Sequence, residues 1–273
     1  MVSMPDWELI YDPQPLSGTW NMAVDEYLFR LARAGTRTFL RFYTWLRPTA
    51  SLGCGQDINK VLNLEECQKR GVDVVRRLTG GKLVLHHLEV TYSVASARAD
   101  IFTSTLEGSY RLISEALVRG LRLLGLPAEL AASTPPGYAR SHLPCFAYPA
   151  RNEVEVRGKK VIGSAQKRSG SCFLQHGSIP LITEAELLSA ISYGLDSSRK
   201  EGLTSLSDEL GREISYDQAV GYLIEGFKQQ FQTDPVPCHF SPEEMELIRK
   251  IEAARYASWQ WTGERRAPEG FDF

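Results

Sequence analysis

The chain has 273 residues, of which 43% are hydrophobic and 23% are charged, and its formal net charge is −2. These proportions are typical of a globular enzyme, and the near-neutral charge excludes the strongly basic surface of a general nucleic-acid binder. No apolar run is long enough to span a bilayer, and the N-terminus lacks the basic and apolar segments of a signal peptide. We therefore expect a cytoplasmic protein with no nucleic-acid or membrane partner.

The first half of the chain is predicted to contain several short strands and a few helices. Apolar residues at helical spacing and closing glycines predict helices, and runs rich in β-branched and aromatic residues predict strands. The expected helices are residues 21–35, 62–71 and 104–125, and the expected strands are 38–45, 72–79, 82–87 and 90–96. Residues 46–56, LRPTASLGCGQ, are expected to interrupt the strands because they contain one proline and two glycines.

The second half begins with a predicted hairpin and continues with helices. Residues 153–166, EVEVRGKKVIGSAQ, alternate around a two-residue turn ending in glycine, and residues 171–179 form a strand expected to pair with them. Helices are expected at 184–192, 215–231 and 241–259. Mostly consecutive strands argue against a Rossmann-type sheet. The pattern predicts one α/β domain over 1–273, built on a mixed sheet, with residues from about 183 to 273 mostly helical and packed on that sheet.

The first candidate motif is RRLTGGKLVLHHLEVTYSV, residues 76–94. Gly80 and Gly81 allow positive φ and let the backbone approach a ligand closely, so the loop could present N–H groups to a carbonyl or phosphate oxygen. The segment does not match the phosphate-binding P-loop pattern. The alternative is an ordinary hairpin turn with solvated arginines on its rim, and the spacing alone does not separate the two.

The second candidate pairs Cys145 with Lys160, which follows the hairpin turn. A thiol is mostly protonated at neutral pH, and a nearby cation favours the reactive thiolate. If the hairpin returns Lys160 to Cys145, that cation is in place. The small residues Gly163, Ser164 and Ala165 after the lysine leave room for a ligand. The alternatives are a buried, inert cysteine and a lysine that only caps its strand in solvent.

Metal and disulfide chemistry are not expected. The five cysteines are an odd number without CxxC spacing, and no carboxylate or cysteine accompanies the histidines at metal-ligand spacing. A cysteine–histidine dyad remains open, because the sequence does not decide which histidine, if any, reaches Cys145. The candidates for that partner are His86, His87, His142 and His176.

Together these motifs resemble the biotin/lipoate A/B protein ligase family. RRLTGGKLVLH is similar to the family's RRxTGGxxVxH signature, and GKKVIGSAQKR to its KxxGxAQ lysine motif. The resemblance is closest to the LipM-type octanoyltransferases, through PCF, KVIGSAQ and LQHGSIPL, and it covers most of the chain. It implies a central mixed sheet flanked by helices, like the catalytic domains of biotin and lipoate protein ligases, and a narrow tunnel for a medium-chain acyl group.

The resemblance also implies roles for individual residues. Cys145 matches the acyl-accepting cysteine of the octanoyltransferases, and Lys160 matches the lysine that contacts the acyl carbonyl. Two groups match the walls of the acyl site: the first-motif residues Arg77, Thr79, Gly80, Gly81 and His86, and the facing-strand residues Ser164, Ala165, His176 and Gly177. Two departures from the ATP-dependent ligases are Lys82, where those enzymes usually have a third glycine, and the presence of Cys145.

The implied reaction takes an octanoyl group from octanoyl-acyl carrier protein to a lysine of a lipoyl-domain protein, such as the glycine cleavage H protein, in lipoate biosynthesis. It passes through a thioester on Cys145, and because a thioester is already activated, no cofactor is expected. Lys160 could stabilise the oxyanion or deprotonate the incoming amine. Three alternatives stay open: an amidotransferase between lipoyl-domain proteins, an ATP-dependent lipoate ligase that does not use Cys145, and a non-enzymatic carrier-binding module.

Overall fold

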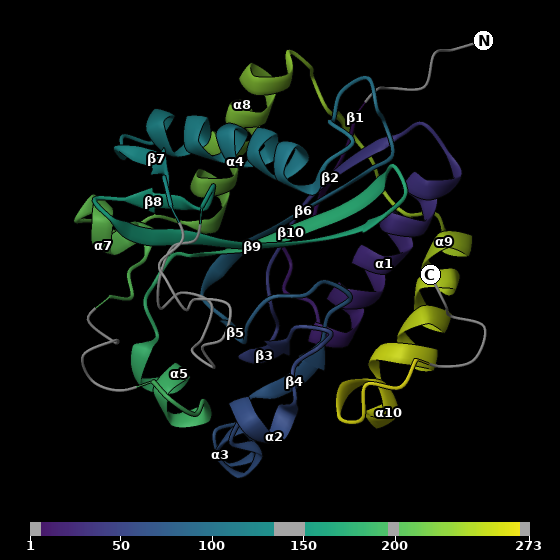
Figure 1. Cartoon of the computed structure of the whole chain (residues 1–273), viewed down its shortest axis with the longest axis vertical. Helices are drawn as coiled ribbons and strands as arrows, with labels where there is room; N and C mark the ends of the chain where they lie inside the picture. The colour runs from purple at the N-terminus through teal and green to yellow at the C-terminus, as the bar shows by residue number, and fades with distance from the viewer. Residues whose placement is uncertain (1–6, 134–150, 196–201, 268–273) are drawn as a thin grey trace.

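The computed structural model describes residues 7–133, 151–195 and 202–267. Within these residues, eight strands form the main sheet, which runs through the middle of the molecule (Figure 1). Their order across the sheet is β11 (Val236–Pro237), β1 (Trp7–Tyr11), β2 (Thr38–Tyr43), β6 (Glu89–Ser96), β10 (Cys172–Pro180), β9 (Lys159–Ser169), β8 (Val154–Val156) and β7 (Ala128–Leu130). The β11–β1 and β1–β2 pairs are parallel and the others are antiparallel, so the expected mixed sheet is confirmed.

A second sheet lies beside one face of the main sheet. Its three strands are β4 (Asp73–Arg76), β3 (Thr49–Leu52) and β5 (Val84–His86), in that order. β3 occupies the stretch that was expected to be irregular, and that expectation is wrong. Pro48 and Gly53 bound this strand rather than break it, because its four buried residues pair with β4 on one side and β5 on the other.

The helices cover both faces of the main sheet. They are α1 (Gly18–Ala34), α2 (Ile58–Val61), α3 (Leu64–Lys69), α4 (Leu106–Leu123), α5 (Ala185–Ile191), α7 (Leu206–Leu210), α8 (Tyr216–Phe231), α9 (Pro242–Ile251) and α10 (Trp259–Thr262). Figure 1 shows α4 and α8 above the sheet, and α1 with the second sheet below it. Of the helices in the described ranges, none combines the length and the apolar character that a bilayer crossing requires.

Alternation along the central strands divides the core between the two faces. Tyr92 and Val94 of β6 pack among the side chains of α4 and α8, whereas Ala95 packs among those of α1. Successive side chains of a strand point to opposite faces, so Tyr92 and Val94 share one face of β6, and the buried polar residues Thr91 and Ser93 lie on the other. This arrangement leaves the face toward α1 and the second sheet for polar side chains from the same strands.

The predicted hairpin is confirmed, and its turn explains its sequence. Arg157 and Gly158 have φ values of 51° and 76°, and together they connect β8 to the antiparallel β9. Two consecutive positive φ values are typical of the tight turns whose twist matches that of the flanking strands. The next strand, β10, pairs with β9 as expected, with Gly177 opposite Ser164.

The C-terminal segment, which was expected to be mostly helical, also contains a short strand. Val236 and Pro237 form β11, which adds a short parallel edge strand beside β1. The single helix expected at 241–259 has the predicted Ser241 capping box, but α9 ends at Ile251. A π-helical turn, Glu252–Tyr256, follows it. That wider turn brings the Tyr256 hydroxyl to 2.8 Å from a carboxylate oxygen of Glu26 in α1.

Candidate functional site

A cavity lies between the two sheets, and we call it the inner pocket. Its lining comes from α1, both sheets and the loop after β4: Met22, Tyr43, Ser51, Arg77, Gly81, Val84, His86, Thr91, Gly163, Ser164, Ala165, His176, Gly177 and Ser178. The first motif and the lysine motif, which are far apart in the sequence, therefore meet at one cavity.

Arg77 holds the glycine loop of the inner pocket in place. Its Nε donates to the Thr79 hydroxyl at 3.1 Å, and its Nη1 donates to the Ser51 carbonyl at 2.9 Å and hydroxyl at 3.0 Å. Its Nη2 donates to the carbonyl oxygens of Gly80 and Lys82, both at 2.8 Å. A guanidinium has five N–H donors in a fixed plane, so these bonds fix the position of the loop relative to β3.

One chain of hydrogen bonds runs from Arg77 to His176 on β10. Thr79 accepts a bond from Arg77, and its hydroxyl lies 2.7 Å from Nε2 of His176. Nδ1 of His176 lies 2.8 Å from the carboxylate of Asp25 on α1. The bonding pattern assigns the protons: Thr79 donates to Nε2, and Nδ1–H donates to Asp25. The imidazole is thereby held as a neutral ring with a fixed orientation.

A second chain runs from Arg77 to His86 on β5. The Ser51 hydroxyl accepts from Arg77 and lies 2.7 Å from Nε2 of His86, and Nδ1 of His86 lies 2.7 Å from Glu89. The ring of His86 stacks on Trp45 with a centroid separation of 4.2 Å. The polar groups of the inner pocket are thus largely satisfied by one another, which suits an apolar ligand rather than a charged one.

The electrostatics around His176 agree with the neutral ring. Burial lowers the pKa of His176 below its ordinary value, although the hydrogen bond and charge of Asp25 oppose this. Burial by itself raises the pKa of Asp25. The hydrogen bond from His176, together with the charge of Arg41, outweighs that effect and lowers the pKa of Asp25. Arg41 Nη1 lies 3.3 Å from Asp25, so the buried carboxylate stays ionised beside a permanent cation.

A wider cleft, which we call the entrance cleft, adjoins the inner pocket. Its lining is Gly80, Gly81, Leu106, Glu107, Tyr110, Arg151, Asn152, Glu153, Ser164, Ala165 and Gln166. Gly81, Ser164 and Ala165 line both spaces. Glu153 forms a buried ion pair with Lys160, with 2.7 Å between Oε1 and Nζ. The lysine of the second motif is therefore held by a residue of the entrance cleft.

Two glycines of the inner pocket are required by geometry. Gly81 has φ of 90°, in the left-handed region where other residues are strained. At Gly177 an added Cβ would lie 2.5 Å from a ring carbon of Tyr92 and 2.6 Å from the hydroxyl of Ser164. Gly81 thus gives the loop its conformation where the inner pocket joins the entrance cleft, and Gly177 allows β10 to lie close to Tyr92 and Ser164.

The structure places the candidate site residues as follows. Arg77, Gly81, His86, Ser164, Ala165, His176 and Gly177 line the inner pocket, Gly80 lines the entrance cleft, and Thr79 is buried between Arg77 and His176. His87 does not line the inner pocket; its ring bonds to Glu184. Cys145 and His142 lie outside the described residues, and the roles of all these residues stay predictions.

Sequence reasoning missed the carboxylates that position these groups. Asp25 and Glu89 each hold one histidine, and Glu153 holds Lys160. Glu89 follows His86 by three residues across a tight connection, a spacing that could have indicated a pair. Asp25 and His176 are separated by 151 residues, and no local signal connects them.

Most of the sequence matches a known protein family. Residues 17–228 match the model of the lipoyl protein ligase A/B catalytic domain. The chain belongs to this family. Among its relatives, the octanoyltransferase LipM of Carboxydothermus hydrogenoformans is 37% identical over 270 residues, covering 94% of this chain and 98% of that protein. The octanoyltransferase LipM of Kyrpidia tusciae is 37% identical over 272 residues, with the same shares covered.

Solved structures show the same fold for this lipoyl protein ligase A/B family member. The crystal structure of lipoate-protein ligase A bound with ATP superposes with a TM-score of 0.81 at 24% identity, covering 96% of this chain and 99% of that one. A bi-partite lipoate protein ligase from Thermoplasma acidophilum gives a TM-score of 0.77 at 22% identity, covering 98% and 99%. The expected ligase-like catalytic fold is confirmed.

Proposed function

We propose that this protein transfers an octanoyl group from octanoyl-acyl carrier protein to a lysine of a lipoyl-domain protein, such as the glycine cleavage H protein, in the cytoplasm. Relatives of nearly the same length, named octanoyltransferases, support the reaction class. The observation that carries the proposal is the buried ion pair of Lys160 with Glu153, because Glu153 lines the entrance cleft that continues into the inner pocket.

The inner pocket suits the acyl chain. Burying the methylenes of an octanoyl group contributes on the order of 5 kcal/mol, at about 0.8 kcal/mol for each CH₂. Because the histidines of this pocket are already bonded to Asp25 and Glu89, the chain displaces no polar partner. The carbonyl at the head of the chain would then lie toward Gly81 and Ala165, where the pocket meets the entrance cleft.

The chemistry proceeds in two transfers. The thiolate of Cys145 attacks the thioester carbonyl, the bond to the carrier sulfur breaks, and the carrier leaves as a thiol after taking up a proton. The ε-amine of the acceptor lysine then attacks the acyl-enzyme, an amide forms, the amine loses a proton, and the Cys145 thiolate is released. Covalent catalysis of this kind replaces one difficult step by two easier ones.

Lys160 stabilises the oxyanion in this proposal. An ammonium held 2.7 Å from a carboxylate inside the protein is a preorganised positive charge. Such a charge stabilises the tetrahedral intermediate without reorganisation at the moment of reaction. This placement favours an electrostatic role over that of a general base, which would need the amine in its neutral form.

Mass spectrometry of the intact protein tests the proposal. After incubation with octanoyl-acyl carrier protein in the absence of ATP, we expect the wild type to gain one octanoyl group. Cys145→Ser should gain none, and Cys54→Ser, a matched control at an exposed cysteine, should be acylated like the wild type. Acylation only by an octanoylated lipoyl-domain donor would indicate an amidotransferase. No adduct, with acceptor modification only when ATP and free lipoate are present, would indicate a ligase and overturn the proposal.

A further inference from the structure

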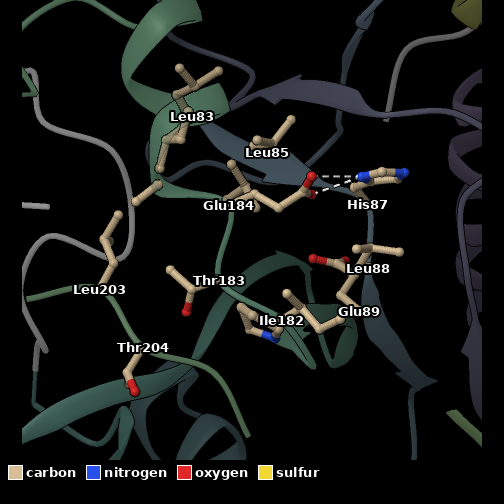
Figure 2. Close-up of a pocket in the computed structure, with 14 residues that line it drawn as sticks. Leu83, Leu85, His87, Leu88, Glu89, Ile182, Thr183, Glu184, Leu203 and Thr204 are labelled. Atoms are coloured by element: carbon tan, nitrogen blue, oxygen red, sulfur yellow. Dashed lines mark hydrogen bonds and ion pairs between the residues drawn. The ribbon is translucent and has the colours of Figure 1, made fainter. Parts of the chain in front are cut away.

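A second pocket lies behind the wall of the inner pocket. It is open to solvent on one side, and we call it the outer pocket. It is formed by β5, the start of β6, α5 and the neighbouring loops, and Figure 2 shows leucines around it and the His87–Glu184 pair at one side. His87 Nδ1 lies 2.8 Å from a carboxylate oxygen of Glu184. Most of the other lining side chains are apolar, including Leu85, Leu88, Ile182 and Leu203.

Val84 is the residue that lines both the inner and the outer pocket. Its side chain is buried, yet among the described residues it belongs to none of the three larger hydrophobic clusters and packs with Leu203 of the outer pocket. Glu89 also lines the outer pocket and bonds to His86 and Ser178 of the inner one. The wall between the two pockets is therefore about one side chain thick.

Val84 lies at one of two places where the inner pocket meets a neighbouring space. The pocket joins the entrance cleft at Gly81, Ser164 and Ala165, and it meets the outer pocket at Val84. Val84 thus lies at a boundary of the inner pocket other than the one shared with the entrance cleft. We propose that Val84 ends the acyl site and sets the longest saturated chain that it accepts. This inference builds on the proposed function, because it assigns the inner pocket to an acyl group.

The size of the effect follows from the transfer energy of methylenes. Each methylene buried in an apolar cavity tightens binding by about fourfold, and one that meets a wall gains nothing or clashes. Reducing Val84 to alanine would open the inner pocket toward the apolar outer one. Chains longer than octanoyl would then gain several buried methylenes, whereas the octanoyl chain would gain none.

Isothermal titration calorimetry with saturated fatty acids tests this inference without requiring the transfer reaction. Dissociation constants for octanoic, decanoic, dodecanoic and tetradecanoic acid are measured for the wild type, Val84→Ala and Val84→Leu. We expect Val84→Ala to shift the ratio of dodecanoic to octanoic affinity toward the longer acid by at least about tenfold. The larger side chain of Val84→Leu should shift it toward the shorter acid.

Two further variants make the result specific to the wall. Val74→Ala is the same substitution in the same small sheet at a position lining neither pocket, and it should leave the ratio unchanged. Adding Leu203→Phe to Val84→Ala refills the outer pocket and should abolish the gain. The inference would be overturned if the affinity ratio is unchanged in both Val84 variants, or if the gain in Val84→Ala survives the addition of Leu203→Phe. It would also be overturned if the wild type binds no fatty acid. A shift in affinity without any acyl-enzyme would overturn the proposed function alone.

Discussion

Lys160 and Glu153 form an ion pair inside the protein, with 2.7 Å between Nζ and Oε1 and both side chains almost fully buried. Lys160 lies on β9, and Glu153 stands immediately before β8, so the pair depends on the hairpin turn between the two strands. In the proposed mechanism Glu153 is a positioning residue, because it acts through Lys160 and not on the acyl group.

We predict that Glu153→Gln lowers kcat for octanoyl transfer by at least about tenfold with little change in KM, because the charge of Lys160 is no longer held at the carbonyl. Steady-state kinetics with octanoyl-acyl carrier protein measures both constants. Glu153→Asp, which keeps the charge, should recover part of the rate. Glu129→Gln, at an exposed glutamate of β7, should behave as the wild type. A Glu153→Gln enzyme with full kcat would refute the positioning role.

Arg77→Lys should weaken the acyl site although it conserves charge. Lysine cannot reproduce the planar set of donors that reaches Ser51, Thr79 and the Gly80 carbonyl, so buried acceptors lose their partners. Each buried acceptor that is left without a hydrogen bond lowers the free energy of unfolding by about 1–3 kcal/mol. We expect a clear fall in the urea concentration at half-unfolding and a weaker affinity for octanoic acid. Arg70→Lys, at an exposed pair with Glu66, is the control, and an equal effect there would contradict the prediction.

Gly177→Ala and Gly221→Ala should have opposite effects on stability. At Gly177 the added methyl group would overlap Tyr92 and Ser164, and we expect a loss of about 1–3 kcal/mol in the free energy of unfolding together with weaker acyl binding. At Gly221, in α8, an added Cβ meets nothing within 4 Å, and alanine should stabilise the helix by up to about 1 kcal/mol. Thermal and urea unfolding of the two variants measure both changes in stability. A Gly177→Ala protein as stable as the wild type would contradict the close contact of Gly177 with Tyr92 and Ser164.

His176 should make the protein less stable as the pH falls below about 6.5. Burial lowers the pKa of His176 in the folded chain below its unfolded value of 6.5. Above pH 6.5 the His176 ring is neutral in both the folded and the unfolded chain, so its full contribution to the free energy of unfolding is present. Below pH 6.5 the His176 ring takes up a proton in the unfolded chain but not yet in the folded chain. The free energy of unfolding therefore falls as the pH falls from 6.5 to the folded pKa, by up to about 1.4 kcal/mol per pH unit. The groups facing the ring are Asp25, Thr79, Arg77 and His86.

Urea unfolding at pH 7.5 and 5.5 measures this dependence. The free energy of unfolding of the wild type should fall more between pH 7.5 and pH 5.5 than that of His176→Gln does. His239→Gln, at an exposed histidine, should lose as much as the wild type. An identical pH dependence in the wild type and His176→Gln would show that His176 titrates alike in both states.

Much of the fold could be predicted from local sequence patterns. Apolar residues at helical spacing identified α1, α4 and α8, alternation identified the β8–β9 hairpin, and Ser241 with Glu244 identified the start of α9. These signals are local, because propensity, capping and turn chemistry act over a few neighbouring residues. β3 and β11 were missed since short strands exist only through partners supplied by distant parts of the chain.

The candidate site shows the same division. The sequence by itself supplied the glycine loop, Lys160 and the histidines as motif residues, and their resemblance to a family gave them expected roles. Only the tertiary structure decided that Arg77 connects both histidines, that Asp25 holds His176, and that Val84 stands between two cavities. Hydrogen bonds and cavity walls depend on distances between atoms of different elements, and those distances are set by how the two sheets and α1 pack together.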